Sequence, residues 1–353
     1  MITVNVDVAV IGGGPAGIAA AVRASESSRT VALLDESPQV GGQIWRHRSR
    51  ATLPSSAREW LRRLDKSGAR ILGTSVVDAR EDAGEFIITA ERGGAPVIVR
   101  ARAIVLATGA RERFLPFPGW TLPGVIGVGG AQALLKAGLS FAGKRVVIAG
   151  SGPLLLPVAA SLKASGANVV RVAEQASRSA VASFAMGLIT RPATLLQAAR
   201  YRAGFFGTPY VFGEWVAAAR GGDAVREVDV TNGSTTRTIA CDVLCAAFGL
   251  VPNTELAQLL DCTVVGGAVM VDERQQTSRA GIYCAGESTG IGGVELSLAE
   301  GAIAGLCAAG RDADRRLVSR RNALRSIAAQ MERVFAPRAE LRTLAKPDTI
   351  ICR

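Results

Sequence analysis

The sequence has one histidine, His47, no Cys-x-x-Cys pair and only 5% aromatic residues. General-base catalysis most often uses histidine, and dithiol redox chemistry needs two neighbouring thiols. The nearest cysteines are Cys241 and Cys245, on one expected buried strand. Four strand residues span about 13 Å, whereas a disulfide needs Cα atoms within about 7 Å. We therefore interpret both as core residues, and the lone His47, in a basic loop, as a surface residue.

The chain also lacks any apolar run of the roughly 18–20 residues that a membrane helix needs, and its N-terminus does not resemble a signal peptide. We therefore expect a cytoplasmic protein with no membrane span. The net charge of +11 comes mostly from arginine. The arginines are scattered and not interleaved with aromatic residues, so we expect no nucleic-acid partner. The clusters at 46–50 and 311–325 indicate solvated faces or a docking face for an acidic partner.

The sequence is rich in glycine, with 40 residues. The first of these glycines form a pattern typical of a dinucleotide-binding turn. A buried strand at 3–11 leads into Gly12-x-Gly14-x-x-Gly17, and a helix follows. Such glycines permit a tight turn, close approach of a pyrophosphate and close helix packing. Pro15 suits the first helical turn. A second strand at 30–34 ends in Asp35 and Glu36, where a carboxylate can bind a ribose diol.

A second, altered unit begins at residue 144. A strand leads to Gly150 and Gly152, and the next strand ends at Glu174, 24 residues after Gly150. The third glycine position is Leu155, which we expect to push helix and strand apart. We expect Pro157 near the fifth helical position, where it would remove a hydrogen bond and bend the helix. Three occupancies stay open here: NAD(P)H, a structural adenine nucleotide such as ATP, or no ligand.

Three further segments resemble motifs of flavoproteins with two dinucleotide-binding domains, the pyridine nucleotide-disulfide reductase superfamily. They are Gly41-Gly42-Gln43 with Ile44-Trp45-Arg46, Ala107-Thr108-Gly109 after a strand, and Ala285-Gly286-Glu287 after another strand. Glu287 replaces the usual Asp and is one methylene longer. The resemblance implies an α/β fold with two Rossmann-like domains, the second inserted in the first, and FAD as the cofactor. It implies cofactor contacts at these residues: Gly12, Gly14, Pro15, Ala16, Gly17, Asp35, Glu36, Gly42, Gln43, Val77, Ala107, Thr108, Gly109, Gly286, Glu287, Gly293 and Val294, with Gly150, Gly152 and Glu174 in the second site.

A narrower resemblance covers residue 4 to about 310. The motifs at 41–46, 115–125, 129–132, 149–156, 244–253 and 285–293 are similar to the FAD-containing alpha subunits of heteromeric amino-acid and opine dehydrogenases, a group with opine oxidase, proline and hydroxyproline dehydrogenase and hydrogen cyanide synthase. We predict an FAD domain at 1–117 and 263–310, an inserted NAD(P)-like domain at 118–262, and a helical tail at 311–353. Apolar spacing in the tail, from Leu317 to Val334, allows it to lie on the body or on a partner.

In that group a partner subunit carries a second flavin and oxidises the C–N bond, and a [2Fe-2S] domain often follows. The resemblance thus implies two partners, a second flavoprotein subunit and a small ferredoxin-like subunit, with [2Fe-2S] or FMN at the partner interface. A cluster needs four ligands. Cys352 alone cannot hold one, and we interpret it as the start of such a domain.

Three hypotheses about function are compatible with the sequence. We favour an electron-transfer subunit of a dehydrogenase for an imino acid, amino acid or opine, with no catalytic residue of its own for the substrate step. One alternative is a stand-alone NAD(P)H-dependent reductase of a small carrier. The other is a scaffold subunit whose nucleotide is structural.

Overall fold

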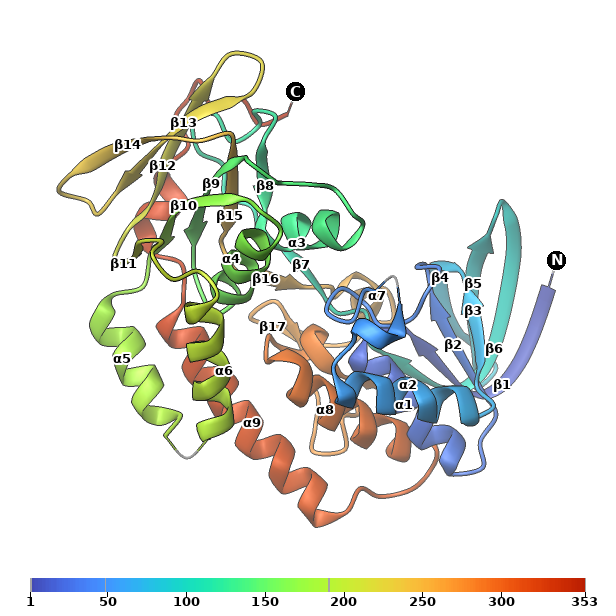
Figure 1. The fold of residues 1–353 in the computed structure, drawn as a ribbon. Coiled ribbons are helices and arrows are strands. Elements are labelled where there is room, and N and C mark those ends of the chain that lie inside the picture. The colour runs from blue at the N-terminus through green and yellow to red at the C-terminus, as the bar shows by residue number, and fades with distance from the viewer. Residues whose placement is uncertain (1, 48, 190, 353) are drawn as a thin grey trace. The chain divides into compact units, whose positions relative to one another are not determined.

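The computed structural model describes residues 2–47, 49–189 and 191–352. The chain forms two compact units (Figure 1). Unit 1 comprises Met1–Arg111 and Val251–Ala329, and unit 2 comprises Glu112–Leu250 and Gln330–Arg353. The second unit is thus inserted in the first, as the fold prediction requires. The divisions differ in detail from those predicted, because residues 251–262 belong to unit 1 and the tail is shared between the units.

Unit 1 is built on one seven-stranded sheet. Its order is β3-β2-β1-β6-β5-β4, with β19 beside β6. The strands are β1 (Ile2–Ile11), β2 (Val31–Asp35), β3 (Arg70–Gly73), β4 (Ser75–Asp82), β5 (Glu85–Arg92), β6 (Ala95–Leu106) and β19 (Ile282–Cys284). The neighbours β3, β2, β1, β6 and β19 run parallel, whereas β4, β5 and β6 pair antiparallel. Parallel strands carry apolar residues on both faces, and β1 is apolar and buried over its last four residues.

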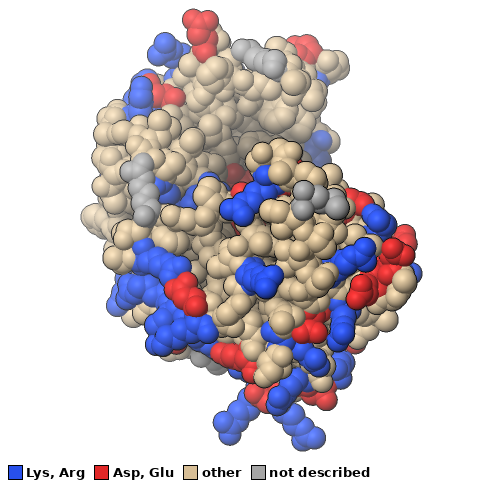
Figure 2. Space-filling model, turned by 90° about the vertical axis from the view of Figure 1, so that its right-hand side faces the viewer, with Lys and Arg blue, Asp and Glu red and all other residues tan. Residues whose placement is uncertain are grey.

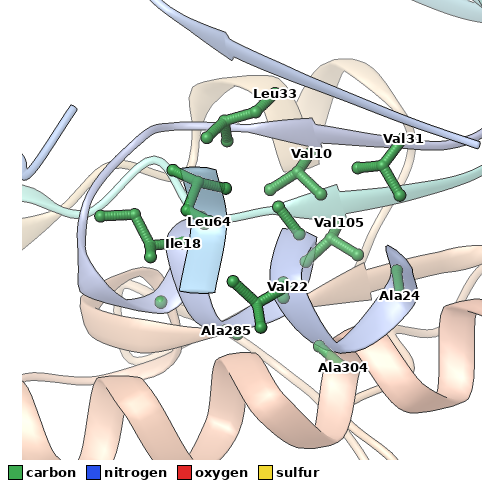
Figure 3. Close-up of a cluster of buried hydrophobic side chains, with 14 of the residues drawn as sticks. Val10, Ile18, Val22, Ala24, Val31, Leu33, Leu64, Val105, Ala285 and Ala304 are labelled. Atoms are coloured by element: carbon green, nitrogen blue, oxygen red, sulfur yellow. The ribbon is translucent and has the colours of Figure 1, made fainter. Parts of the chain in front are cut away.

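Helices flank this sheet. They are α1 (Pro15–Glu26), α2 (Ser55–Lys66), α7 (Glu255–Leu259), α8 (Gly293–Ala308) and the first part of α9 (Arg315–Val334). The short elements η1 (Arg50–Thr52), β17 (Val264–Val265), β18 (Ala268–Val269) and η2 (Gly286–Thr289) complete the unit. In the core, Val10, Val31 and Val105 from the sheet face Ile18 and Val22 of α1 (Figure 3).

Helices α1 and α8 pack with almost no side chain between them. A Cβ on Gly301 would lie 2.1 Å from the carbonyl oxygen of Ala16, and one on Gly305 would lie 2.2 Å from that of Ala20. Real Cβ atoms do not approach this closely, so only glycine fits at both positions. This packing fixes the start of α1 against α8.

Unit 2 has a parallel five-stranded sheet in the order β11-β10-β9-β15-β8. The strands are β8 (Val125–Gly127), β9 (Arg145–Gly150), β10 (Asn168–Glu174), β11 (Tyr210–Phe212) and β15 (Val243–Ala247). One face packs against α3 (Val128–Lys136) and α4 (Leu155–Ala164). The other packs against an antiparallel sheet of β12 (Trp215–Gly221), β13 (Val225–Thr231) and β14 (Thr236–Ala240). The remaining elements are α5 (Arg178–Gly187), α6 (Pro192–Ala203) and η3 (Ala339–Thr343), with β7 (Ala110–Glu112) and β16 (Leu250–Pro252) where the chain passes between units.

Helix α9 forms as its apolar spacing predicts, and its first part lies on unit 1. Leu324 is buried against Leu296 and Ala299 of α8, with Leu317 and Ala328 packed beside them. Of the two positions that the sequence allows for the tail, the body or a partner, this stretch lies on the body.

The surface charge is mixed. On the face drawn in Figure 2, Lys and Arg side chains form separate groups, many of them next to Asp or Glu. In the part of the chain that the structure describes, no helix is both long enough and apolar enough to cross a membrane.

Candidate functional site: the glycine turn of unit 1

The turn between β1 and α1 can be built only with glycine. Gly12 has φ +105°, and a Cβ there would lie 2.2 Å from the carbonyl oxygen of Ala107. A Cβ on Gly17 would lie 1.8 Å from the carbonyl oxygen of Gly12. Around Gly14, by contrast, the nearest atom is 4.0 Å away, the Cα of Gly42. Two of the glycines therefore close the turn, and the third leaves its outer face open.

The open face carries hydrogen-bond donors without acceptors. Pro15 begins α1, and among the described residues no acceptor bonds the N–H groups of Gly14, Ala16 and Gly17. Unpaired N–H groups and the helix dipole together make a helix N-terminus an anion site. The geometry therefore suits a phosphate group.

At the end of β2, Asp35 lies beside this turn. Its carboxylate accepts hydrogen bonds from the backbone N–H of Gly13 and, at 2.8 Å, of Ser37. The side chain is half-buried and lines a cavity of about 630 Å³. A carboxylate can accept about four hydrogen bonds, so two positions stay available toward the cavity.

The same cavity brings together residues from distant parts of the chain. Of the predicted site residues, Gly12, Asp35, Glu36, Val77 and Thr108 line it. Sequence reasoning missed the opposite wall, which Asn253, Glu255, Leu256 and Leu259 form. The predicted boundaries place these four in the inserted domain, but they belong to unit 1.

Hydrogen bonds explain why this segment lies in unit 1. Asn253 donates from its backbone N–H to Gly109 O at 2.9 Å and from Nδ2 to Thr108 O at 2.8 Å. Thr108 Oγ1 donates back to Asn253 O at 2.8 Å and lies 3.0 Å from Ser288 Oγ. The predicted Ala107-Thr108-Gly109 motif is therefore a junction between two later segments, which no local pattern indicates.

The predicted Gly41–Gln43 loop lies on the glycine turn. Gly41 N–H donates to Gly13 O at 2.7 Å. Gly42 has φ +58°, and a Cβ there would lie 3.0 Å from Gly14 Cα. Gln43 is exposed beside it. The loop thus packs against the glycine turn.

Glu287, at the start of η2, is half-buried and lacks a donor. No described residue donates a hydrogen bond to its carboxylate, and burial raises its pKa. The preceding Gly286 has φ +79° and approaches α1, since a Cβ there would lie 2.8 Å from Ala16 Cβ. Gly293 and Val294 begin α8. A half-buried carboxylate has lost part of its hydration, so a hydroxyl from a ligand would stabilise it.

A buried polar network supports η2 from behind. Glu300 of α8 accepts hydrogen bonds from Gly286 N–H at 2.9 Å, Thr289 Oγ1 at 2.8 Å and Arg325 Nε at 2.7 Å. Sequence reasoning missed this network. The sequence does contain a hint of this network, because Glu300 is one of few charged residues within the apolar α8 and arginines recur in the helix that follows.

In unit 2, Gly150, Gly152 and Glu174 also lie together at a strand–helix turn. A Cβ on Gly150 would lie 1.9 Å from Ala247 O, and Glu174 accepts a hydrogen bond from Gly152 N–H at 2.9 Å. The expectation for Pro157 was wrong. Helix α4 begins at Leu155, so Pro157 lies in the first turn, where its missing N–H costs no helical hydrogen bond.

Cys241 and Cys245 are core residues, as predicted, but only Cys245 lies on the strand β15, because Cys241 precedes it. Cys241 and Cys245 are buried and free of disulfides, and burial raises the pKa of Cys241 to about 11. Cys352 is exposed. Among the described residues, no three His, Cys, Asp or Glu side chains are grouped to hold a metal ion. His47 is half-buried, and its Nδ1 lies 2.7 Å from Trp45 O.

These features define a flavoprotein-type oxidoreductase fold with an open glycine turn beside a cavity in unit 1. The chain belongs to the pyridine nucleotide-disulphide oxidoreductase family, whose model matches residues 6–305. It is 31% identical to an opine oxidase subunit of Agrobacterium tumefaciens strain Ach5, over 98% of this chain and 76% of that one. It is 29% identical to hydrogen cyanide synthase subunit HcnB of Pseudomonas aeruginosa, over 99% and 82%.

Among solved structures, thioredoxin reductase of T. acidophilum shares the fold. Its TM-score is 0.69, at 21% identity over 87% of this chain and 98% of that one. The family and this fold confirm the predicted fold class, and they support FAD as the cofactor.

Proposed function

We propose that this chain is the FAD-binding electron-transfer subunit of a multi-subunit dehydrogenase or oxidase that acts on the C–N bond of an imino acid, amino acid or opine. The observation that carries the proposal is the pairing of a complete dinucleotide site in unit 1 with relatives that are named as subunits of opine oxidase and hydrogen cyanide synthase.

The residues of unit 1 fit FAD. We assign the pyrophosphate to the N–H groups of Gly14, Ala16 and Gly17, because no acceptor in the described part of the chain bonds these donors. We assign the adenosine ribose to Asp35, whose carboxylate faces the cavity of about 630 Å³. Ligand pockets usually measure roughly 300–1,000 Å³, so the cavity is large enough for a nucleoside.

We assign the ribityl chain to Glu287. Its half-buried carboxylate has no donor from the described chain, and a ribityl hydroxyl would supply one. Glu300 and Arg325 act as positioning residues, since they hold the backbone of η2 and thereby the start of Glu287. When bound, the flavin accepts and releases electrons, and the chain's own groups bind it and shield it from water.

Substrate oxidation is assigned to a second flavoprotein subunit, with a small ferredoxin-like subunit as a further partner. The chain has no paired cysteines near the turn, and its one histidine bonds its own loop. Among the described residues, neither a histidine nor a cysteine lines the cavity beside the turn. Electrons would therefore arrive at this chain after the C–N bond has been oxidised elsewhere.

The test is rapid-mixing spectroscopy on the purified chain, alone and after assembly with a candidate partner encoded beside it. We expect one FAD per chain, no flavin bleaching by proline, hydroxyproline or an opine in the isolated chain, and bleaching after assembly. Substrate turnover by the isolated chain would refute the proposal. Bleaching by NADH alone would support the stand-alone reductase, and a flavin that stays oxidised during turnover would support the scaffold.

A further inference from the structure

Unit 2 repeats the strand–glycine–helix arrangement of unit 1, but the N–H groups of Gly152 and Leu155, whose counterparts in unit 1 are open, are already bonded within the chain. Position 153 is proline, as position 15 is in unit 1, so neither turn has an N–H there. Leu155 N–H donates to Gly152 O at 3.1 Å, and Leu156 N–H donates to Pro153 O at 3.2 Å. Among the described residues of unit 1, the matching N–H groups of Gly14 and Gly17 have no acceptor, whereas Ile18, which matches Leu156, donates to Gly14 O at 2.9 Å. The second turn therefore offers little to a pyrophosphate.

The acidic residue at the end of the second strand is also closed off. Glu174 accepts hydrogen bonds from the N–H groups of Gly152 and Ala176, both at 2.9 Å, as Asp35 does from Gly13 and Ser37. Asp35 is half-buried and lines a cavity, whereas Glu174 is 0% exposed with Tyr210 against it. A ribose cannot reach this carboxylate without displacing the side chains that cover it.

The chain's own C-terminal segment lies on the same turn. Ser151 Oγ donates to Phe335 O at 2.7 Å, and the Cβ of Phe335 lies 4.0 Å from where a Cβ on Gly152 would stand. Gln175 Nε2 donates to Ala336 O at 3.0 Å, and its Oε1 accepts from Arg338 N–H, also at 3.0 Å. The segment thus bonds residues on both strand ends of the turn.

Aromatic contacts hold this segment in place. The ring of Phe335 packs edge-on against Phe184 of α5, with 5.6 Å between centroids and an interplanar angle of 81°. The guanidinium of Arg338 lies 4.5 Å from the ring centroid of Trp215. Such aromatic and cation–π contacts add to the hydrogen bonds.

We infer that unit 2 binds residues 335–338 of its own chain in the place where a reductase of this family would hold a pyridine nucleotide. The family name implies such a nucleotide, and the residues present do not fit it. The second unit then serves as an anchor for the C-terminal segment. No nucleotide in unit 2 takes part in electron transfer. This is independent of the FAD assignment in unit 1.

The first test is ligand binding by the whole chain. We expect no saturable binding of NADH, NADPH or ATP in equilibrium dialysis at concentrations up to about 1 mM, the upper end of usual affinities for such ligands. Saturable binding of any of the three at unit 2, read from protection of the 150–155 peptide in hydrogen exchange, would overturn the inference.

The second test measures the anchor directly. A Ser151→Ala, Gln175→Ala double variant should speed amide exchange at 335–338 by about tenfold or more, since three hydrogen bonds to this segment are lost. The matched control is Ser165→Ala, which removes a bond to Leu162 O in the same unit. Exchange in β12 and β13 reports whether the variants are folded. Equal exchange at 335–338 in the double variant and the control would contradict the anchor.

Discussion

Glu174 gives unit 2 a stability that depends on pH with a definite sign. Its carboxyl group is 0% exposed, and burial raises its pKa from 4.5 to about 7. Below pH 4.5 the group is protonated in both the folded and the unfolded chain. Between pH 4.5 and 7 the unfolded chain loses the proton while the folded chain keeps it, so stability falls as pH rises. Above pH 7 the loss is complete.

The size of this loss follows from the two pKa values. At about 1.4 kcal/mol for each pH unit, the interval from 4.5 to about 7 corresponds to about 3 kcal/mol. Glu174→Gln mimics the protonated form. We therefore expect the wild type to lose about 3 kcal/mol of unfolding free energy between pH 4.5 and 8, and the variant to show no such fall.

Urea unfolding at several pH values measures the effect. In a background with Trp45 and Trp60 replaced by phenylalanine, the remaining fluorescence comes from Trp120 and Trp215, both in unit 2. The matched control is Glu332→Gln, at an exposed position of α9 within unit 2, which should keep the wild-type slope. Parallel curves for the wild type and Glu174→Gln would refute the reasoning, because the carboxyl group would then titrate alike in both states.

Three further substitutions test unit 1. Gly17→Ala places a Cβ 1.8 Å from a backbone oxygen of the glycine turn, so the turn must change shape and we expect the purified protein to be colourless, without flavin. The control Gly73→Ala, whose Cβ would have nothing within 4 Å, should purify yellow. Equal flavin content in the two variants would contradict this prediction. Glu287→Ala should raise the FAD dissociation constant about tenfold, while Glu287→Asp should keep most of the wild-type affinity. Fluorescence titration with FAD measures both constants, and a dissociation constant unchanged in Glu287→Ala would count against the ribityl assignment. Arg325→Ala leaves Glu300 buried without its cation, so thermal and urea unfolding should show a loss of about 3–5 kcal/mol; a loss below about 1 kcal/mol would mean that solvent replaces the arginine.

Sequence reasoning succeeded where the backbone itself imposes the residue. Gly12 and Gly17 have no alternative, because any side chain there would overlap a carbonyl oxygen. The strand before them is buried on both faces, so its apolar run is visible in the sequence. The second turn at Gly150 was recognised for the same reason.

What escaped prediction depends on tertiary contacts. Asn253 reaches Thr108 across 145 residues of sequence, and no local pattern indicates that pairing. The burial of Glu174 comes from residues packed around it, although its position matches that of Asp35. A carboxylate at the expected spacing can therefore either face a cavity or be enclosed, and only packing decides which.

The buried Glu300–Arg325 pair has a practical consequence for anyone who shortens this protein. A cut at residue 310, where the motifs of the first unit end, would remove the cation and leave a carboxylate fully enclosed at the base of η2. The 20-residue helix α9 is thus part of the smallest piece in which Glu300 keeps its cation. Expression boundaries should be placed after α9, and sequence motifs alone would place them before it.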